Sequence, residues 1–427
     1  MKASIINMGC KVNQFESTAM LEMLKTSGYE LSAPKDVDLV VLNTCAVTGR
    51  AESEAISILR RLRRHNPQAK VIGVGCLAQI NPDRLQGLCD LVLGQGQKSS
   101  LPELIKMPSG TTLVPPKAEP IGDLGDPKPW RTRALHKIQD GCDAYCAYCA
   151  VPLARGPSRS FGLDRVLSGL ESYLEMGEKE VVLTGIHLGL WGRDLEPSHD
   201  LSVLLSEIDR ALGPKLTAMR LRLSSLEPLE VPQVLDALLD YDWLVPHIHT
   251  PIQSGSDAIL KRMGRPYTRD HVSCLIVNLK LLMPHVNIGT DVLVGFPGET
   301  DEDFQQTLEL VENLPFGYLH VFPFSPRPGT RAANLEGQVP PEVKRGRVSK
   351  LKKLDVEKRL KFINQQIGDT RQAIIENTLH RSGRMKALTD NYIPALLQPD
   401  AEASPGQMVT ITLGEPQNPY GMAEAYL

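Results

Sequence analysis

The sequence lacks several features that would place it in a familiar class. No apolar run approaches the roughly 18 residues of a membrane-spanning helix, and residues 1–5 lead into a strand-like segment rather than a secretory signal. The net charge of −3 does not indicate a nucleic-acid binder. Cysteine is scarce, with 8 in 427 residues, which disfavours a disulfide framework and favours metal ligands in a reducing compartment. We therefore expect a cytoplasmic protein.

Three of the cysteines are nevertheless concentrated in one loop. Cys142, Cys146 and Cys149 are separated by three and then two residues, so one short loop can wrap a single metal centre. A four-iron cluster takes four ligands and no fourth cysteine is nearby, which would leave one iron open to another ligand. Zinc is the alternative, but a structural zinc site is usually closed by a second pair of ligands, and no such pair follows.

The first hundred residues alternate strand-like and helical segments. Strands are predicted at residues 4–8, 38–43 and 71–74, and helices at residues 15–27 and 50–65. This βαβαβ pattern implies a parallel sheet, whose strands all end at one edge.

Three further cysteines follow these strands. Cys10, Cys45 and Cys76 each come one or two residues after a strand, so we expect them to converge at the sheet edge as a second three-cysteine cluster site. The alternative is three unrelated buried cysteines. Cys89 and Cys274 lie within apolar segments and are predicted to be core residues.

The later segments predict two more folding units. Residues 106–130 are rich in proline and indicate a domain boundary. Six strands separated by helices are then predicted at residues 135–140, 180–184, 218–223, 246–250, 287–294 and 317–323. They imply a full or partial parallel barrel, with residues 142–149 at the carboxyl end of its first strand, where such barrels carry their chemistry. Short strands predicted at residues 371–377, 385–389, 392–398, 408–413 and 422–426 suggest a small all-β barrel.

Taken in order, the whole chain resembles the radical S-adenosylmethionine (SAM) methylthiotransferases. The matching segments are residues 9–14, 43–48, 75–76, 141–149, 151–152, 154–156, 184–186, 249–256, 289–292 and 295–300. The resemblance implies an α/β chain of four parts. These are an N-terminal methylthiotransferase domain (1–110), a linker (111–130), a radical SAM (βα)6 partial barrel (131–365) and a TRAM-like β domain (366–427).

The resemblance also implies two [4Fe-4S] clusters and SAM. The cluster ligands would be Cys142, Cys146 and Cys149 at the SAM-cleaving cluster, and Cys10, Cys45 and Cys76 at the auxiliary cluster. The auxiliary cluster would carry the sulfur to be inserted, one SAM would methylate that sulfur, and another would provide a radical that activates a substrate C–H bond. Residues that follow the barrel strands are expected to contact SAM, together with the aromatic residue before the last cysteine. They are Tyr148, Thr184, Gly185, Ser224, Ser225, Gln253 and Gly295.

Members of the family act on N6-threonylcarbamoyladenosine or N6-isopentenyladenosine at position 37 of tRNA, or on an aspartate of a ribosomal protein. Residues 9–14 and 138–143 look most like the threonylcarbamoyladenosine branch, so the expected partners are tRNA and a flavodoxin- or ferredoxin-like electron donor. Basic residues at 60–64 and 344–361 would suit tRNA phosphates. The C-terminal domain is acidic and would add little electrostatic attraction for RNA. The rivals are a non-catalytic RNA-binding metalloprotein and a radical SAM enzyme of another reaction class.

Overall fold

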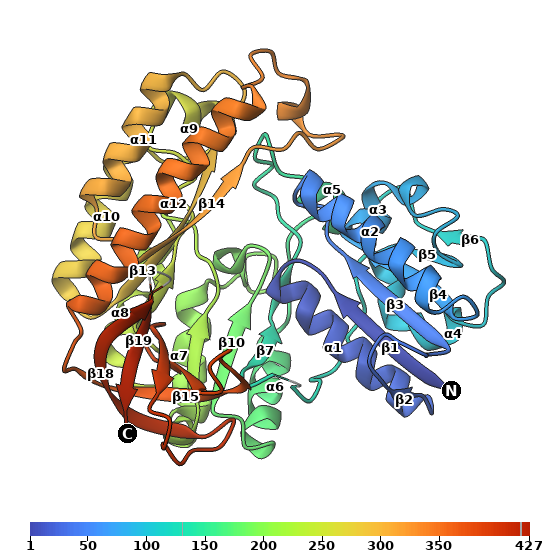
Figure 1. Ribbon diagram of the computed structural model, residues 1–427, viewed down its shortest axis with the longest axis horizontal. Coiled ribbons are helices and arrows are strands. Elements are labelled where there is room, and N and C mark those ends of the chain that lie inside the picture. Colours follow the sequence, from blue (N-terminus) through green and yellow to red (C-terminus); the bar gives the residue numbers. More distant parts are fainter. Residues whose placement is uncertain (130, 419–420) are drawn as a thin grey trace.

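Three units follow one another along the chain in Figure 1: a parallel-sheet domain (blue), a larger strand-and-helix barrel, and a small β barrel (red). The computed structural model describes residues 1–129, 131–418 and 421–427. The predicted α/β fold class with a C-terminal all-β unit is confirmed.

The N-terminal domain is built on a six-stranded parallel sheet in the order β2-β1-β3-β4-β5-β6. Its strands are β1 Lys2–Asn7, β2 Glu30–Leu31, β3 Leu39–Thr44, β4 Lys70–Gly75, β5 Leu91–Leu93 and β6 Thr111–Leu113. Its helices are α1 Lys11–Thr26, α2 Gly49–His65, α3 Cys76–Ile80 and α4 Leu101–Leu104. β3 is apolar apart from its last two residues and buried along its whole length, as a central strand with helices on both faces must be.

The proline-rich segment differs from its prediction as a pure linker. Residues 111–113 form β6, which pairs in parallel with β5 and so extends the N-terminal sheet. The strand ends at Leu113, two residues before Pro115. A short strand at the edge of a sheet can form beside prolines, because few of its backbone N–H groups need a partner. The last residue of the predicted linker, Trp130, lies outside the described residues.

All six predicted barrel strands are present, in two three-stranded parallel sheets with the orders β11-β10-β7 and β12-β13-β14. They are β7 Ala134–Lys137, β10 Glu180–Thr184, β11 Arg220–Leu223, β12 His247–His249, β13 Asn287–Val294 and β14 Tyr318–Pro323. A bridge between Leu221 and Leu244 joins the sheets into one arc, which ends at β7 and β14. The short strands β8 Gln139–Asp140 and β9 Arg159–Ser160 form a separate ribbon.

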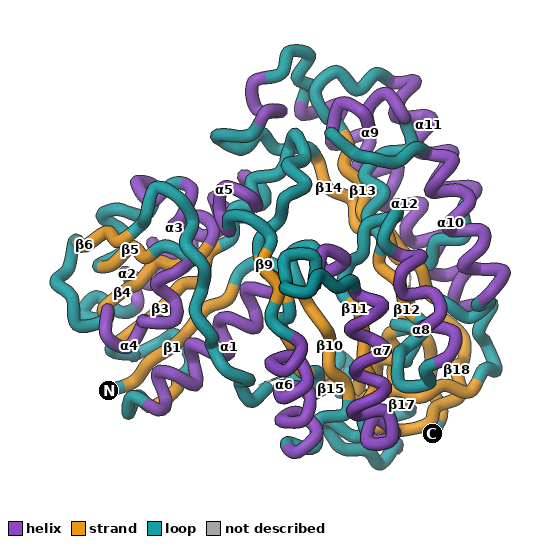
Figure 2. Tube along the Cα trace, turned by 180° about the vertical axis from the view of Figure 1, so that it is seen from behind, coloured by secondary structure: helices purple, strands orange, loops and turns teal. Residues whose placement is uncertain are grey.

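Helices cover the outside of this arc, as the two opposite views of Figures 1 and 2 show. They are α6 Leu163–Glu175, α7 Leu201–Leu212, α8 Leu235–Asp240, α9 Asp257–Met263, α10 Arg269–Leu282, α11 Asp301–Asn313 and α12 Pro341–Asn364. The short helix α5 Val151–Arg155 instead lies against α3 of the N-terminal domain. The helices and strands share the largest apolar core of the protein, including Trp191 and Leu221, both fully buried.

The C-terminal unit is a closed barrel in the order β15-β16-β17-β19-β18. Its strands are β15 Thr370–Leu379, β16 Met385–Thr389, β17 Pro394–Leu397, β18 Met408–Asn418 and β19 Met422–Tyr426. It docks on the amino ends of the larger barrel's strands, where Arg220 donates to the Gln372 and Leu388 carbonyls and Arg222 to the Asp390 carbonyl.

The N-terminal domain contacts both free edges of the arc. Near β7, the Glu16 carboxylate of α1 bonds Lys137 and Arg155, each at 2.8 Å. Near β14, the Gly49 amide donates to Ser325 Oγ at 2.9 Å, and Arg327 pairs with Glu52. The domain therefore spans the open side of the partial barrel.

The two cysteines predicted to be core residues have different environments. Cys89 is buried, as predicted, whereas Cys274 is exposed, so that prediction was wrong. Cys274 lies on α10, whose buried residues Val272, Ile276 and Leu279 repeat every three to four positions. An apolar run on a helix also covers flanks that face solvent.

Candidate active site

Cys10, Cys45 and Cys76 come together at the carboxyl edge of the N-terminal sheet. Cys10 precedes α1, Cys45 follows β3 and Cys76 opens α3. Cys45 packs against Gly9, where a Cβ would come within 2.8 Å of the Cys45 Sγ, and the φ of Gly9 is +87°. Both observations require glycine where the Cys10 loop approaches Cys45. Cys10 is exposed while the other two are buried, so the group is open on the Cys10 side.

These thiols have surroundings that suit a metal cluster. Burial raises the pKa of Cys45 to about 12 and also raises that of Cys76, so neither ionises unaided at neutral pH. Arg155 and Lys98 act in the opposite direction on Cys76, and Gln95 Nε2 donates to its Sγ at 3.2 Å. Clusters bind thiolates and accept hydrogen bonds on sulfur, so this donor set fits one.

The second group lies on the loop of residues 142–149, which joins β8 to α5. The loop is fixed at its middle, because the Ala147 amide donates to the Met263 carbonyl and the Ala147 carbonyl accepts from Ala332, both at 2.8 Å. All three cysteines are partly exposed. Burial raises the pKa of Cys149 to about 12, so here too thiolates would need a bound cation.

A histidine holds the first cysteine of this loop. His187 Nδ1 lies 3.3 Å from Cys142 Sγ, and its Nε2 lies 2.6 Å from Glu230 Oε1. Burial alone would lower the pKa of His187, but the hydrogen bonds to Cys142 and Glu230 raise it to about 10. The imidazolium can therefore donate to the sulfur and to the carboxylate together.

An arginine holds the aromatic residue of the loop. Arg265 donates to the Tyr148 hydroxyl at 2.6 Å and pairs with Glu227 at 2.6 Å. Burial raises the pKa of Tyr148 well above its ordinary value, so the phenol stays neutral. The contact fixes the ring beside Cys149.

Zinc does not fit either cysteine group. Tetrahedral zinc at about 2.3 Å from each sulfur would bring thiolates to about 4 Å from one another. Among the described residues, three potential ligand atoms lie within 4.8 Å of one another only in His249, Asp291 and His320. At least two thiols in each cysteine group are therefore farther apart, a spacing that suits ligands on separate irons of one cluster.

A cavity of about 200 Å³ is lined by residues that neighbour one cysteine of each group. Val47 and Thr48, just beyond Cys45, form one wall, and Tyr148, next to Cys149, forms another. The remaining lining residues are Gln253, Asp291, Leu293, Phe322, Pro323, Phe324 and Ser325. Aromatic and apolar side chains with a few polar groups are the usual lining of a ligand site. A larger cavity, about 580 Å³ and including Tyr241 and Trp243, lies beside the C-terminal barrel, away from the cysteines.

Two of the residues predicted to contact SAM line the smaller cavity, namely Tyr148 and Gln253. Gln253 has a φ of +63°, and its backbone pairs with β13 through the Asp291 carbonyl and the Leu293 amide. Ser225 is exposed, and its Oγ lies 2.8 Å from His249 Nδ1.

The other predicted contacts are more enclosed. Thr184 and Ser224 are buried, and the Ser224 hydroxyl has no partner among the described residues. A Cβ on Gly185 would meet Gln139, and one on Gly295 would come within 2.2 Å of Lys344 Cγ. Gly295 is thus packed against α12, which sequence analysis did not anticipate.

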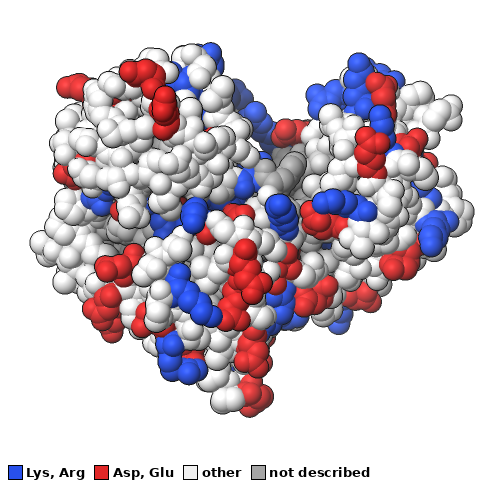
Figure 3. Space-filling view, turned by 90° about the horizontal axis from the view of Figure 1, so that it is seen from below, with Lys and Arg blue, Asp and Glu red and all other residues white. Residues whose placement is uncertain are grey.

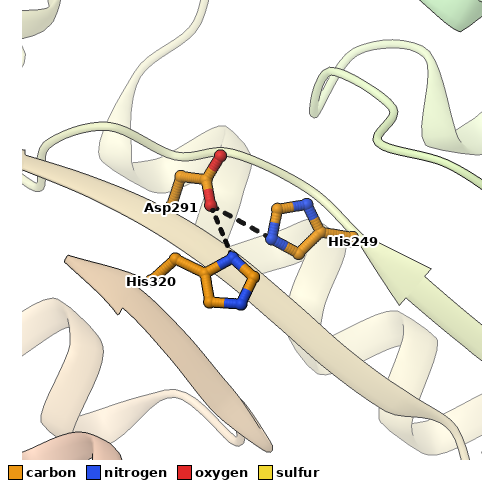
Figure 4. Close-up of side chains that lie close together, drawn as sticks. All are labelled: His249, Asp291 and His320. Carbon is orange, nitrogen blue, oxygen red and sulfur yellow. Dashed lines mark hydrogen bonds and ion pairs between the residues drawn. The ribbon is translucent and has the colours of Figure 1, made fainter. Parts of the chain in front are cut away.

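A cluster on the inner barrel wall was also missed. Figure 4 shows His249 Nε2 and His320 Nδ1 converging on Asp291 Oδ1, each at 3.2 Å. Burial would raise the pKa of Asp291, but the two histidines hold it below its ordinary value. An ionised carboxylate bridged by two imidazoles therefore stands at the cavity wall. All three residues lie on predicted barrel strands, but only His249 is near the end of its strand, so there was little signal for the cluster in the sequence.

His187 and Arg265 were missed for different reasons. His187 comes three residues after the end of β10 at Thr184, so its position just beyond a strand end was a usable signal. Arg265 lies just beyond α9, and nothing in its local sequence indicates that it faces Tyr148.

The fold and these cysteines define a radical SAM protein. The profile of the Radical SAM superfamily matches residues 137–311, and that of the "Uncharacterized protein family UPF0004" matches residues 2–94. Solved structures of TsrM from Kitasatospora setae, a radical SAM methyltransferase, share the fold, with TM-scores of 0.56 and 0.57 at 18% and 16% identity. They cover 78% and 89% of this chain and 77% and 79% of theirs.

Curated relatives define the family more closely. The threonylcarbamoyladenosine tRNA methylthiotransferase MtaB of Thermotoga maritima is 38% identical over 87% of this chain and 86% of its own. The MtaB of Bacillus subtilis is 34% identical over 97% of this chain and 94% of its own. The tRNA-2-methylthio-N(6)-dimethylallyladenosine synthase of Bartonella quintana is 32% identical, over 96% and 93%. The chain belongs to the radical SAM tRNA methylthiotransferase family, which confirms the resemblance in its motifs.

Family membership implies SAM and an iron–sulfur cluster as cofactors, and a reductant for the cluster. In the described part of the chain, no helix is both long and apolar enough to cross a membrane.

Proposed function

We propose that this chain converts N6-threonylcarbamoyladenosine at position 37 of tRNA into its 2-methylthio derivative. The observation that carries the proposal is one cavity lined by Val47 and Thr48, which follow Cys45 of the N-terminal group, and by Tyr148, which precedes Cys149 of the barrel group. The N-terminal group is Cys10, Cys45 and Cys76, and the barrel group is Cys142, Cys146 and Cys149. Each group lacks a fourth cysteine ligand, which suits clusters with an open iron.

Two clusters and SAM would be held by this arrangement. When bound, they supply the one-electron chemistry that breaks an unactivated C–H bond and the sulfur and methyl group that replace the hydrogen. The protein's own side chains hold the ligands: His187 orients Cys142, Arg265 orients Tyr148, and Gln95 donates to Cys76. His187, Arg265 and Gln95 are not proposed to act as an acid or a base on the substrate.

The N-terminal domain keeps the two sites facing each other. Glu16 on α1 bonds Arg155 and Lys137 of the barrel, while Glu52 on α2 pairs with Arg327 beyond β14. Because both edges of the arc are bridged, a base inside the cavity lies between the thiol groups and is shielded from water.

The relatives support the choice of nucleoside. Four relatives at 33–38% identity are named for threonylcarbamoyladenosine, and four more, at 32–34%, for dimethylallyladenosine. The difference in sequence identity between the two groups of relatives is small. The choice between the two nucleosides is therefore tested below with defined substrates.

Helix α12 supplies a surface for tRNA phosphates. Its exposed cations are Arg345, Lys350, Lys352, Lys353 and Lys361. Two other cations of the helix are used internally, since Arg347 pairs with Glu299 and Lys358 bonds backbone carbonyls. On the lower face of the protein in Figure 3, by contrast, charges of both signs are interspersed.

The second basic segment is also partly used within the protein. Arg63 of α2 pairs with Asp90 at 2.8 Å, whereas Arg60, Arg61 and Arg64 are exposed.

The test is turnover by the anaerobically reconstituted protein with SAM, a reductant and anticodon stem-loops. We expect a methylthio product from the stem-loop carrying threonylcarbamoyladenosine and none from the one carrying isopentenyladenosine. Product from only the latter, or from neither, contradicts the proposal. Zinc at stoichiometry without labile sulfide would support the non-catalytic rival, and 5′-deoxyadenosine without a methylthio product another radical reaction.

A further inference from the structure

Three side chains of the kinds that bind metal ions lie on neighbouring strands of the larger barrel. His249 ends β12, Asp291 lies in β13 and His320 lies in β14. The strand register pairs Asp291 directly with His320. It pairs His249 with Gly289, which is two residues before Asp291 and therefore on the same face of β13. The three side chains thus stand side by side on one face of the sheet, as Figure 4 shows.

The distances between their ligand atoms fit a single ion. His249 Nε2 and His320 Nδ1 each lie 3.2 Å from Asp291 Oδ1, and all three atoms lie within 4.8 Å of one another. Two ligands that are each about 2.1 Å from a metal ion are about 3.0 Å apart at a right angle and about 3.4 Å apart at a tetrahedral angle. An ion can therefore be bound between these atoms with only small movements of the side chains.

His249 has a nitrogen available for an ion. Its side chain is 9% exposed, and its Nε2 has no hydrogen-bond partner among residues 1–129, 131–418 and 421–427. The other ring nitrogen, Nδ1, lies 2.8 Å from Ser225 Oγ. With Nδ1 donating to this hydroxyl, the lone pair of Nε2 faces the Asp291 oxygen, and a cation between them relieves that repulsion. A hydrogen bond from the second ring nitrogen also orients most histidines that bind metals.

An ion can reach this site, because the three side chains adjoin both solvent and the cavity. The side chain of His320 is 49% exposed. Asp291 lines the cavity of about 200 Å³. Leu293 and Phe322 also line it, and they lie two residues further along the same faces of β13 and β14. An ion held by the three side chains would have its remaining coordination positions free for donors in the cavity.

We propose that His249, Asp291 and His320 form a binding site for one divalent transition-metal ion, such as Fe²⁺, Co²⁺ or Zn²⁺. Two imidazoles and one carboxylate with open positions are typical of mononuclear non-haem iron sites, and imidazole nitrogen favours transition metals over Mg²⁺ and Ca²⁺. The site is separate from both cysteine groups, because its set of ligand atoms contains no thiol. It goes beyond the proposed function and holds whichever nucleoside the enzyme modifies.

The test is a titration of the reconstituted protein with Co²⁺ in the absence of oxygen, after loosely bound iron has been removed. Calorimetry gives the affinity and stoichiometry. Electron paramagnetic resonance identifies the ligands, because oxidised [4Fe-4S] clusters give no signal that would mask Co²⁺. We expect one Co²⁺ per chain, with magnetic coupling to imidazole nitrogen and without displacement by Mg²⁺.

Two variants separate a ligand from the residue that orients it. His320→Ala removes a ligand at an exposed position, so we expect the protein to fold and to bind Co²⁺ at least about a hundredfold more weakly. Ser225→Ala removes only the hydrogen-bond partner of His249, and we expect binding about tenfold weaker. Circular dichroism checks the fold of both variants, and cluster absorption checks that the clusters are intact.

The matched control is His285→Ala, which should leave Co²⁺ binding unchanged. His285 Nδ1 also lies near an aspartate, 3.4 Å from Asp369 Oδ2, and its side chain is 59% exposed. This pair belongs to no group of three ligand atoms among the described residues.

Three results would overturn the inference. They are equal Co²⁺ affinity in the natural protein and in His320→Ala, a Co²⁺ signal without coupling to nitrogen, and no binding at any excess of Co²⁺ that leaves the clusters intact. The three side chains would then form a hydrogen-bonded network only. None of these results would contradict the proposed function, which is tested by turnover of the stem-loops.

Discussion

At the scale of single residues, we expect the two cysteine groups to have separable tasks. We predict that Cys45→Ala keeps SAM cleavage but loses sulfur insertion, because it removes a ligand only at the N-terminal site. Cys142→Ala should lose both SAM cleavage and sulfur insertion, because it removes a ligand of the cluster expected to cleave SAM, and insertion depends on that cleavage. The measurements are the production of 5′-deoxyadenosine, the production of the methylthio product and the iron content. In each variant we expect the iron content to fall from roughly eight atoms per chain toward four.

The matched control is Cys274→Ala, because that thiol is exposed on α10 and belongs to neither group. It should behave as the natural protein. Equal loss of SAM cleavage in the Cys45 and Cys142 variants would contradict the division of tasks.

The six cysteines could be predicted because their signal is local: spacing within one loop, or position after a predicted strand. Arg265 could not, because its role depends on which segment lies opposite. Arg265 donates to the Tyr148 hydroxyl, 117 positions earlier in the sequence, and only the tertiary fold brings the two together.

At the scale of elements, a buried ion cluster joins α1 to the barrel. Glu16 bonds Lys98, Lys137 and Arg155 at 2.6–2.8 Å, and all four side chains are almost completely buried. Burial would raise the pKa of Glu16, but the three cations hold it well below its ordinary value. The carboxylate therefore stays ionised at the domain interface.

We predict that Glu16→Gln lowers the free energy of unfolding by about 3–5 kcal/mol, because it leaves the buried Lys98 without its ion-pair partner, while Lys137 and Arg155 keep only Asp140. Urea denaturation followed by circular dichroism is the measurement. Glu22→Gln on the same helix, where the Lys25 pair is exposed, should change it by less than about 0.5 kcal/mol. Similar effects of the two substitutions would show that the cluster does not join the domains.

Element positions were largely predictable, because buried strands are apolar runs bounded by glycine, proline or polar residues. β16 and β19 begin and end at the predicted residues. β6 was not predicted, because three residues beside prolines carry too little pattern to distinguish a strand from a linker.

At the scale of the whole molecule, the surface proposed to bind tRNA is the row of exposed cations on α12. We predict that Lys350, Lys352 and Lys353, changed together to Gln, weaken tRNA binding and reduce the slope of log K against log salt by about three. Binding of full-length tRNA measured over a series of salt concentrations is the test. Lys25→Gln serves as the surface control, and an unchanged slope in the triple variant would place the phosphates elsewhere.

The arrangement of the three units could not be predicted from the sequence. The parallel sheet, the partial barrel and the closed β barrel each have their own periodic pattern. The contacts that set them against one another rest on single side chains such as Glu16, Glu52 and Arg222, whose partners are distant in sequence.

The central claim is that this chain methylthiolates N6-threonylcarbamoyladenosine in tRNA. Mass spectrometry of tRNA nucleosides from cells with and without the gene tests it most directly. The account predicts loss of 2-methylthio-N6-threonylcarbamoyladenosine and accumulation of its unthiolated precursor when the gene is absent. An unchanged level of that nucleoside, with loss of a different methylthio product, would contradict it.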